Sequence, residues 1–130
     1  MHDPLSAYRD AFNRRDLEAA LSLFTARALF EMPLLGQRLI GKAEIALGLR
    51  RIFEISEFAE LELSREKRTR RVCIAEGRLR AKLYRDSIAL EIPLALSLEA
   101  SQGSITRLST YLDARRYRPW ADGPLLARAS

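Results

Sequence analysis

Several residue types that commonly build functional sites are scarce in this sequence. Its single cysteine, Cys73, excludes an internal disulfide and a cysteine-rich zinc site. Its single histidine, His2, stands beside the N-terminal methionine, which argues against a histidine-based catalytic triad and a histidine metal cluster. No apolar run reaches the about 18–20 residues of a membrane span, and the opening residues lack the apolar core of a signal peptide. We therefore expect a cytoplasmic protein with no metal, no cofactor and no membrane contact.

The residues that are present favour one globular domain. The chain has 130 residues, 48% of them hydrophobic, with 22 basic and 17 acidic side chains and a net charge of +5. This hydrophobic fraction fills a core and argues against disorder, and the length suits one domain. We expect a domain over residues 1–118 and an irregular tail over 119–130, which contains Trp120.

The first part of the chain carries three helix starts. Asp3 with Pro4, and later Asp16, suit the N-cap and first-turn positions, and a third helix is expected after Gly41. Apolar residues follow each start at helical spacing. These are Leu5, Tyr8 and Phe12, then Leu17, Ala20, Leu21 and Phe24, and finally Ile45, Leu49, Ile52 and Phe53.

The rest of the chain favours strands. Two short ones are expected at Leu29–Leu35 and Arg38–Ile40, and four longer ones at Phe58–Arg65, Val72–Tyr84, Ile88–Leu98 and Ile105–Asp113. In the longer strands apolar and polar residues alternate, as in a sheet with one face in water. Helices followed by hairpin-linked strands predict an α+β fold, with a curved, mainly antiparallel sheet and the helices on its concave face.

The alternation also predicts what lies inside the sheet. Cys73 falls on the apolar face of its strand, where a buried thiol is inert. Ala75, Gly77 and Ala81 share that face and are small, so they leave space that either larger neighbours fill or a ligand occupies. Pro93 lies on the opposite face of the next strand, which suggests a sheet edge or a bulge.

Four short sequence segments resemble those of a known family. They are Tyr8-Arg-Asp-Ala-Phe-Asn-Arg-Arg-Asp-Leu17, Leu23-Phe-x-x-x-Ala-x-Phe-Glu-Met-Pro33, Gly41-Lys-x-x-Ile45 and Gly103-Ser-Ile-Thr-Arg-Leu-x-x-Tyr-x-Asp113. In this order and spacing they resemble the NTF2-like superfamily, within it the SnoaL-like and ketosteroid-isomerase-like branch, over about residues 5 to 118. The resemblance implies a cone-shaped fold in which the sheet wraps around three N-terminal helices and encloses an apolar pocket.

The isomerase machinery matches this sequence only in part. By resemblance Tyr8 takes the place of the family's catalytic tyrosine, but the two catalytic aspartate positions read as Met32 and Leu94. A thioether cannot abstract a proton. Glu31 is adjacent but points to the opposite strand face. Asp113 shares a strand face with Tyr111. If that face looks inward, the two form a polar pair at the pocket mouth and Asp113 can act as an acid or base, whereas the family's alternation puts the face outside.

Tyr8 keeps two interpretations, a core tyrosine or a ligand contact. The candidate catalytic residues are thus Tyr8, Glu31 and Asp113. The expected pocket lining is mostly aliphatic and aromatic. It consists of Tyr8, Phe12, Phe30, Met32, Phe53, Leu79, Leu94, Leu108 and Leu112.

Three functions remain open. The first is a SnoaL-like domain that binds a small apolar molecule in its pocket. The second is a polyketide cyclase-like or ketosteroid isomerase-like enzyme that uses Tyr8 with Glu31 or Asp113. The third is a non-catalytic structural dimer whose core is filled.

Two surface regions are relevant to binding partners, the outer face of the sheet and a basic run. The weakly charged outer face of Ala89, Pro93, Ala95 and Ser97 predicts a homodimer through the sheet. The basic run Arg65–Arg71 contains no aromatic residue on which a base could stack, so nucleic acid is not the expected partner.

Overall fold

The sheet has six strands in the order β2-β1-β6-β5-β4-β3 within the residues described by the computed structural model, which are 3–84 and 89–113. The helices are α1 (Pro4–Asn13), α2 (Leu17–Ser22) and α3 (Lys42–Ile55), and η1 (Pro33–Leu35) is a 3₁₀ turn. The strands are β1 (Phe24–Met32), β2 (Gln37–Ile40), β3 (Ser56–Arg68), β4 (Val72–Leu83), β5 (Ala89–Ser101) and β6 (Ser104–Leu112). Neighbouring strands are antiparallel except β1 and β6, which are parallel.

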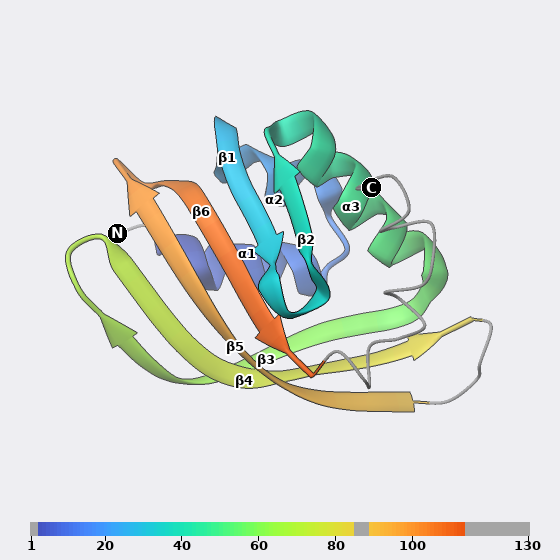
Figure 1. The fold of residues 1–130 in the computed structure, drawn as a ribbon. Helices are drawn as coiled ribbons and strands as arrows, with labels where there is room; N and C mark the ends of the chain where they lie inside the picture. Colours follow the sequence, from blue (N-terminus) through green and yellow to red (C-terminus); the bar gives the residue numbers. More distant parts are fainter. Residues whose placement is uncertain (1–2, 85–88, 114–130) are drawn as a thin grey trace.

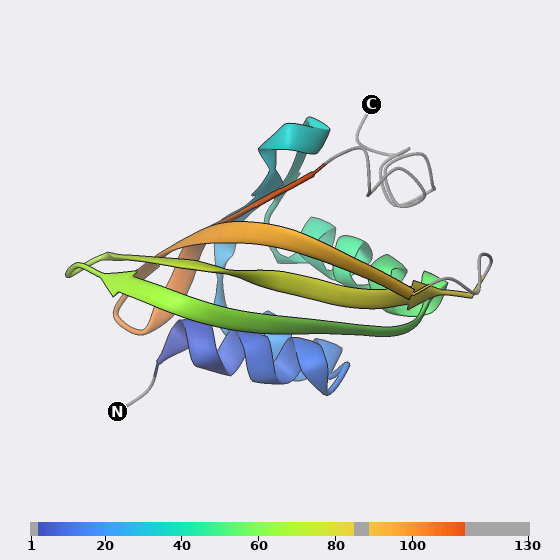
Figure 2. The same ribbon diagram turned by 90° about the horizontal axis from the view of Figure 1, so that it is seen from below.

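The α+β class and the curved, mainly antiparallel sheet are confirmed. In Figure 1, β1, β2 and β6 run steeply, whereas β3 and the ends of β4 and β5 run almost across the view, so the sheet bends strongly. Figure 2 shows α1 lying along one side of the long strands. No helix among the described residues has the length and apolarity needed to cross a membrane.

The helix starts follow the predicted chemistry. The Asp3 carboxylate accepts a hydrogen bond from the Leu5 amide, and that of Asp16 accepts one from the Ala19 amide. The third helix begins directly after Gly41, as predicted. The prediction for Phe24 was wrong, because this residue begins β1 instead of continuing the second helix. The first strand therefore starts earlier than expected and ends at Met32, where Pro33 begins the 3₁₀ turn.

The two long central strands alternate as predicted. The inward side chains of β4 and β5 are buried, among them Leu79, Leu83, Ile92 and Leu96, which are at most 2% exposed. Pro93 lies just before the first residue of β5 that pairs with β6, which is Leu94 opposite Leu112. The expected turn over 84–87 and the tail with its boundary after residue 118 lie largely or wholly outside the described residues.

The sequence suggested that Gly77 leaves space inside the sheet, but the structure gives another reason for a glycine at this position. A Cβ atom at this position would lie 2.0 Å from the carbonyl oxygen of Glu62 on β3. Next to this approach the β3–β4 register shifts between Ser64 and Glu66, and the intervening Arg65 has a φ of 48°. The backbone of β3 thus occupies the space that a side chain would need, as at many strand glycines.

The N-terminus of α1 is tied to the β3–β4 hairpin. Both carboxylate oxygens of Asp3 accept hydrogen bonds from Arg68, at 3.0 and 2.6 Å. Arg68 also donates to Glu66. The Arg68 hydrogen bond is the main cause that holds the pKa of Asp3 well below its usual range, against the opposing effect of burial. One carboxylate therefore caps a helix and anchors a distant hairpin.

Replacing Gly77 with alanine should destabilise the fold. The new methyl group would clash with backbone rather than with a movable side chain, so we expect a loss of about 1–3 kcal/mol or more in the free energy of unfolding. Urea denaturation followed by circular dichroism measures this loss. An unchanged midpoint would mean that β3 does not approach β4 so closely.

Asp3→Asn should reveal the contribution of the carboxylate charge to stability. Asparagine is an equally good N-cap but cannot form the ion pair with Arg68. Because the folded-state pKa of Asp3 is lowered, the stabilisation by its charge is present above the ordinary aspartate pKa of about 4 and lost as the pH falls below it. The difference in unfolding free energy between the wild type and Asp3→Asn should therefore be largest at pH 7 and shrink toward pH 3. A difference independent of pH would contradict the ion pair.

Candidate functional site

A small cavity lies between the helices and the inner face of the sheet. Its volume is about 20 Å³, which suffices for about one water molecule. Its lining comes from α1, α3 and five strands and is mostly apolar. The lining residues are Tyr8, Phe12, Phe30, Met32, Ile52, Leu61, Leu79, Leu94, Thr110 and Leu112.

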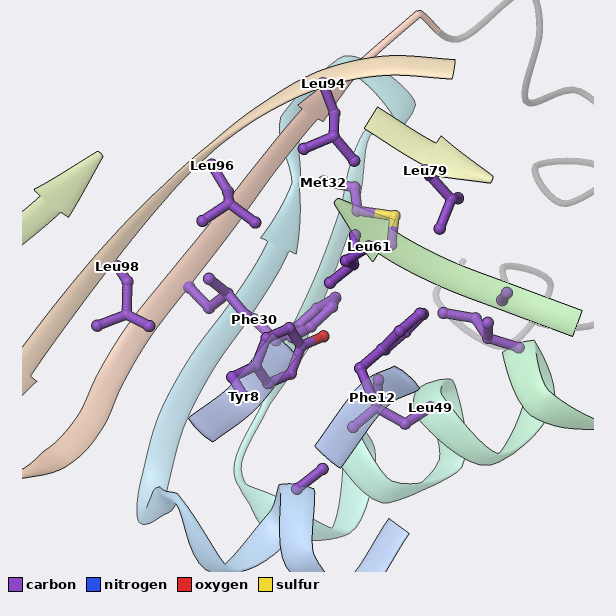
Figure 3. Close-up of a cluster of buried hydrophobic side chains, with 14 of the residues drawn as sticks. Tyr8, Phe12, Phe30, Met32, Leu49, Leu61, Leu79, Leu94, Leu96 and Leu98 are labelled. Atoms are coloured by element: carbon purple, nitrogen blue, oxygen red, sulfur yellow. The ribbon is translucent and has the colours of Figure 1, made fainter. Parts of the chain in front are cut away.

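Tyr8 is the most unusual residue of this lining. It is only 3% exposed, and its ring packs 6.0 Å from the rings of both Phe12 and Phe24. Tyr8 interacts through these two ring contacts, and its hydroxyl has no hydrogen-bond partner among the described residues. Figure 3 shows this hydroxyl pointing from α1 into the space beside Phe12 and Leu61.

The environment of Tyr8 keeps its hydroxyl protonated. Burial raises the pKa of Tyr8 far above its usual range. The hydroxyl borders the cavity and is not a fully enclosed atom, whereas the enclosed side-chain polar atoms without a partner among the described residues are Arg15 Nη1, Gln37 Oε1, Arg51 Nε and Ser56 Oγ. Tyr8 is therefore poised to donate a hydrogen bond to something inside the cavity.

Thr110 supplies the other polar side chain of the lining. It lies on the inward face of β6 with Leu108 and Leu112, as the family resemblance implies, and is 8% exposed. It was absent from the expected lining, as were Ile52 and Leu61. The sequence pattern could have identified all three, because each residue lies on a helix or strand face whose other residues were predicted to be buried.

Two expected lining residues lie elsewhere in the core. Leu108 is fully buried but does not border the cavity. Phe53 packs behind Phe12, with their ring centres 5.4 Å apart, and its other contact is the guanidinium of Arg15 at 5.4 Å. Phe53 therefore supports the wall of the cavity instead of forming its surface.

Arg15 fixes the end of α3 behind this wall. Its guanidinium donates hydrogen bonds to the carbonyl oxygens of Phe53 and, at 3.0 Å, Ser56. A cation at a helix C-terminus satisfies carbonyls that have no partner within the helix. Arg15 has a φ of 59°, so the turn between α1 and α2 aims the side chain at this point.

The carboxylate of Glu31 lies outside the cavity, on the other face of the sheet. It accepts hydrogen bonds from Arg107, at 2.5 and 3.1 Å, and from Ser109, at 2.9 Å. Burial alone would raise the pKa of Glu31, but these hydrogen bonds outweigh burial and hold the pKa below its usual range. Pairing of Glu31 with Tyr8 in one catalytic site therefore has no geometric support.

Asp113 also stands away from Tyr8. It directly follows β6, two residues after Tyr111, which is 39% exposed. Both residues line a separate surface hollow that shares only Leu94 and Leu112 with the cavity. The lining of the cavity, as far as the described residues form it, contains no carboxylate, histidine or cysteine.

The small strand residues do not create the cavity. Ala75 and Ala81 are fully buried, and neither they nor Gly77 borders it. Cys73 is buried on the inner face as predicted, and burial raises the pKa of its thiol, which disfavours the reactive thiolate.

The sequence matches the model of the SnoaL-like domain over residues 5–107. The chain belongs to the SnoaL-like domain family. Among curated proteins, none is significantly similar to it.

Solved structures share the fold of this SnoaL-like chain. A candidate polyketide cyclase from Xanthomonas campestris pv. campestris is 20% identical, with a TM-score of 0.80 over 91% of this chain and 93% of that one. A protein of ketosteroid isomerase-like fold from Catenulispora acidiphila, solved with trimethylamine, is 16% identical, with a TM-score of 0.83 over 95% of each chain. A candidate SnoaL-like polyketide cyclase from Shewanella denitrificans is 15% identical, with a TM-score of 0.79 over 89% and 92%. The predicted NTF2-like, ketosteroid-isomerase-like fold is thus confirmed.

Tyr8→Phe should not weaken the SnoaL-like fold. No protein hydrogen bond is lost and a polar group leaves an apolar interior, so we expect the free energy of unfolding to stay the same or rise by about 1 kcal/mol. Chemical denaturation of Tyr8→Phe, compared with Tyr111→Phe as the matched exposed control, measures this. A clear loss of stability in Tyr8→Phe alone would show that the hydroxyl is hydrogen-bonded in the unliganded protein.

Proposed function

We propose that this SnoaL-like chain binds a small, uncharged, mostly apolar molecule in the cavity beside Tyr8. The observation that supports this function is the Tyr8 hydroxyl, which borders the cavity and has no hydrogen-bond partner among the described residues. A ligand with one acceptor, such as a carbonyl or ether oxygen, would satisfy that hydroxyl and bury its own apolar surface against the surrounding leucines and phenylalanines.

The charge of the lining selects the kind of ligand. The described lining offers two hydroxyls, from Tyr8 and Thr110, and no cation or anion. A charged ligand would lose its hydration without gaining a countercharge, which is strongly unfavourable. We therefore expect neutral ligands with few polar atoms to bind better than carboxylates or ammonium ions of similar size.

The proposal concerns binding rather than catalysis. Proton transfer of the isomerase type needs a carboxylate within hydrogen-bond reach of the substrate. Glu31 is held on the outer face by Arg107 and Ser109, and Asp113 lines the outer hollow. The alternative of an isomerase-like or cyclase-like enzyme that uses these residues is therefore weaker than binding.

The small volume of the cavity requires that its walls move. At about 20 Å³ it holds a water molecule and nothing larger. Met32 is the most adaptable residue of the lining, because its unbranched side chain has three rotatable bonds. A ligand of a few heavy atoms would displace Met32 and the neighbouring leucines and would therefore bind by enlarging a cavity that is largely closed without it.

The same small volume favours a second candidate function. If the interior remains closed, the chain is a structural or interaction protein with a filled core, and the homodimer expected through the outer sheet face becomes its main property. A tightly packed interior is the ordinary state of protein cores.

Ligand binding should appear as a shift of the melting temperature. We expect small neutral ketones, amides and ethers to raise the melting temperature of the wild type, because a ligand that binds only the folded state stabilises it by mass action. Hydrocarbons of equal size should give smaller shifts, and Tyr8→Phe should reduce the response to the ketones to the level of the hydrocarbons.

Tyr111→Phe is the matched control for this experiment, because it removes a tyrosine hydroxyl on the outer face. It should keep the wild-type response. If no compound stabilises the wild type at saturating concentration, the filled-core function stands and ligand binding in this cavity is wrong.

A further inference from the structure

A hollow lined by Arg68, Arg70 and Arg71, here the basic hollow, lies where the start of α1 meets the turn between β3 and β4. Figure 2 shows this turn and the start of α1 at the same end of the sheet. The volume of the hollow is about 110 Å³, which leaves room for several water molecules and so for a small organic molecule. None of its lining residues borders the cavity of Tyr8, so the two spaces are separate.

The turn between β3 and β4 places two arginines next to each other. Thr69 and Val72 close this turn, because the Thr69 amide donates to the Val72 carbonyl at 2.8 Å and the Val72 amide donates to the Thr69 hydroxyl at 3.2 Å. Arg70 and Arg71 are its two central residues, at positions where glycine, asparagine, aspartate and proline are usual. Both are exposed, and neither side chain has a hydrogen-bond or ion-pair partner among the described residues. Turn chemistry alone therefore does not account for the two arginines.

Contacts on both sides hold the turn in place. Arg68, just before it, donates hydrogen bonds to both carboxylate oxygens of Asp3 at the start of α1. The carbonyl oxygen of Arg71 accepts a hydrogen bond from the Ala100 amide near the end of β5, at 3.1 Å. The backbone that carries Arg70 and Arg71 is therefore fixed before a ligand arrives, which lowers the entropy cost of binding.

The charge of the lining favours an anion. The lining contains three arginines and one acidic residue, Asp3. Arg68 pairs with Asp3 and with Glu66, so neither of these carboxylates is the partner of Arg70 or Arg71. A guanidinium can donate two parallel hydrogen bonds to a carboxylate or a phosphate, and two neighbouring arginines therefore suit such a head group.

The apolar part of the lining suits the other end of a ligand. Pro4, Val72 and Ala100 are partly exposed there, and the buried Leu5 and Leu98 complete the wall. An inorganic anion would leave these groups in contact with water, whereas a short hydrocarbon chain would cover them. The small volume limits this chain to a few carbon atoms.

We propose that the basic hollow binds a small organic anion, with a carboxylate or phosphate head group on Arg70 and Arg71 and a short hydrocarbon chain against Val72 and Ala100. The site differs from the cavity of Tyr8 in charge as well as in position, because the described lining of that cavity offers no cation. An anion would lose its hydration there without gaining a countercharge, whereas the arginines of the basic hollow supply one. The two sites therefore select ligands of different classes.

Amide NMR spectra of the full chain, titrated with four-carbon ligands, test the proposal. Butanoate and butyl phosphate carry the two anionic head groups, whereas butan-1-ol carries a neutral one and butylammonium a cationic one. We expect at least one of the anions, and neither of the other two ligands, to shift the amide signals of Thr69, Val72 and Ala100 until they saturate. The anion that binds more tightly identifies the head group.

Substitution of the arginines should remove this binding. Arg70→Gln combined with Arg71→Gln changes two exposed side chains and keeps the backbone contacts of the turn, so circular dichroism should remain native while the affinity for the anion falls at least ten-fold. Arg27→Gln is the matched control, because Arg27 is an exposed arginine of β1 that does not border the hollow. This control and Tyr8→Phe should both keep the wild-type affinity for the anion.

Several results would overturn the proposal. It is wrong if neither anion shifts these signals, or if the double variant keeps the wild-type affinity. If the double variant does not fold, the two single variants replace it, each with an expected loss of several-fold. Equal binding of butan-1-ol would mean that the arginines do not select the ligand, and equal affinity for formate or inorganic phosphate would mean that the apolar wall contributes nothing. Loss of anion binding in Tyr8→Phe would place the ligand in the other cavity.

Discussion

The alternation of side chains along β4 and β5 is the constraint on which the rest of the structure depends. Leu79 and Leu94 point inward to the cavity, whereas Arg78 and Pro93, their immediate neighbours, point outward. A shift of one residue in either strand would exchange these faces and bring charge into the core. The antiparallel register that pairs Gly77 with Leu94 therefore determines both the apolar interior and the charged outer surface.

The two faces of the sheet therefore differ in chemistry, with apolar side chains inside and charged side chains outside. The interior has a protonated tyrosine and apolar walls, and Figure 3 shows Tyr8 together with the leucines of the sheet that face the same interior. The carboxylates of this region lie outside, where arginines neutralise them, as Arg107 does for Glu31. The fold is shared with proteins of several kinds, so the fold alone does not assign a reaction. In this chain the cavity between helices and sheet is bordered by the Tyr8 hydroxyl, which has no hydrogen-bond partner among the described residues.

Local chemistry made much of this fold predictable from the sequence. Asp3, Asp16 and Gly41 indicated three helix starts, and the period of two indicated which residues of the long central strands are buried, such as Leu79 and Ile92. Tertiary packing decided what the sequence could not predict. The assignment of Phe24 to β1 follows from its pairing with β6, and Gly77 is required by a carbonyl from another strand. The volume of the cavity likewise depends on how several side chains fit together, which no local pattern reports.

The parallel pairing of β1 with β6 has a consequence for biosynthesis. Phe24 lies opposite Ile105, so an early strand finds its neighbour only near the end of the described chain. While the ribosome is still making the intervening hairpins, β1 has β2 on one side and an open hydrogen-bonding edge on the other. Contacts of such long sequence separation slow folding. The nascent polypeptide must therefore complete its sheet late, and until then the open edge of β1 is exposed to pairing with other chains.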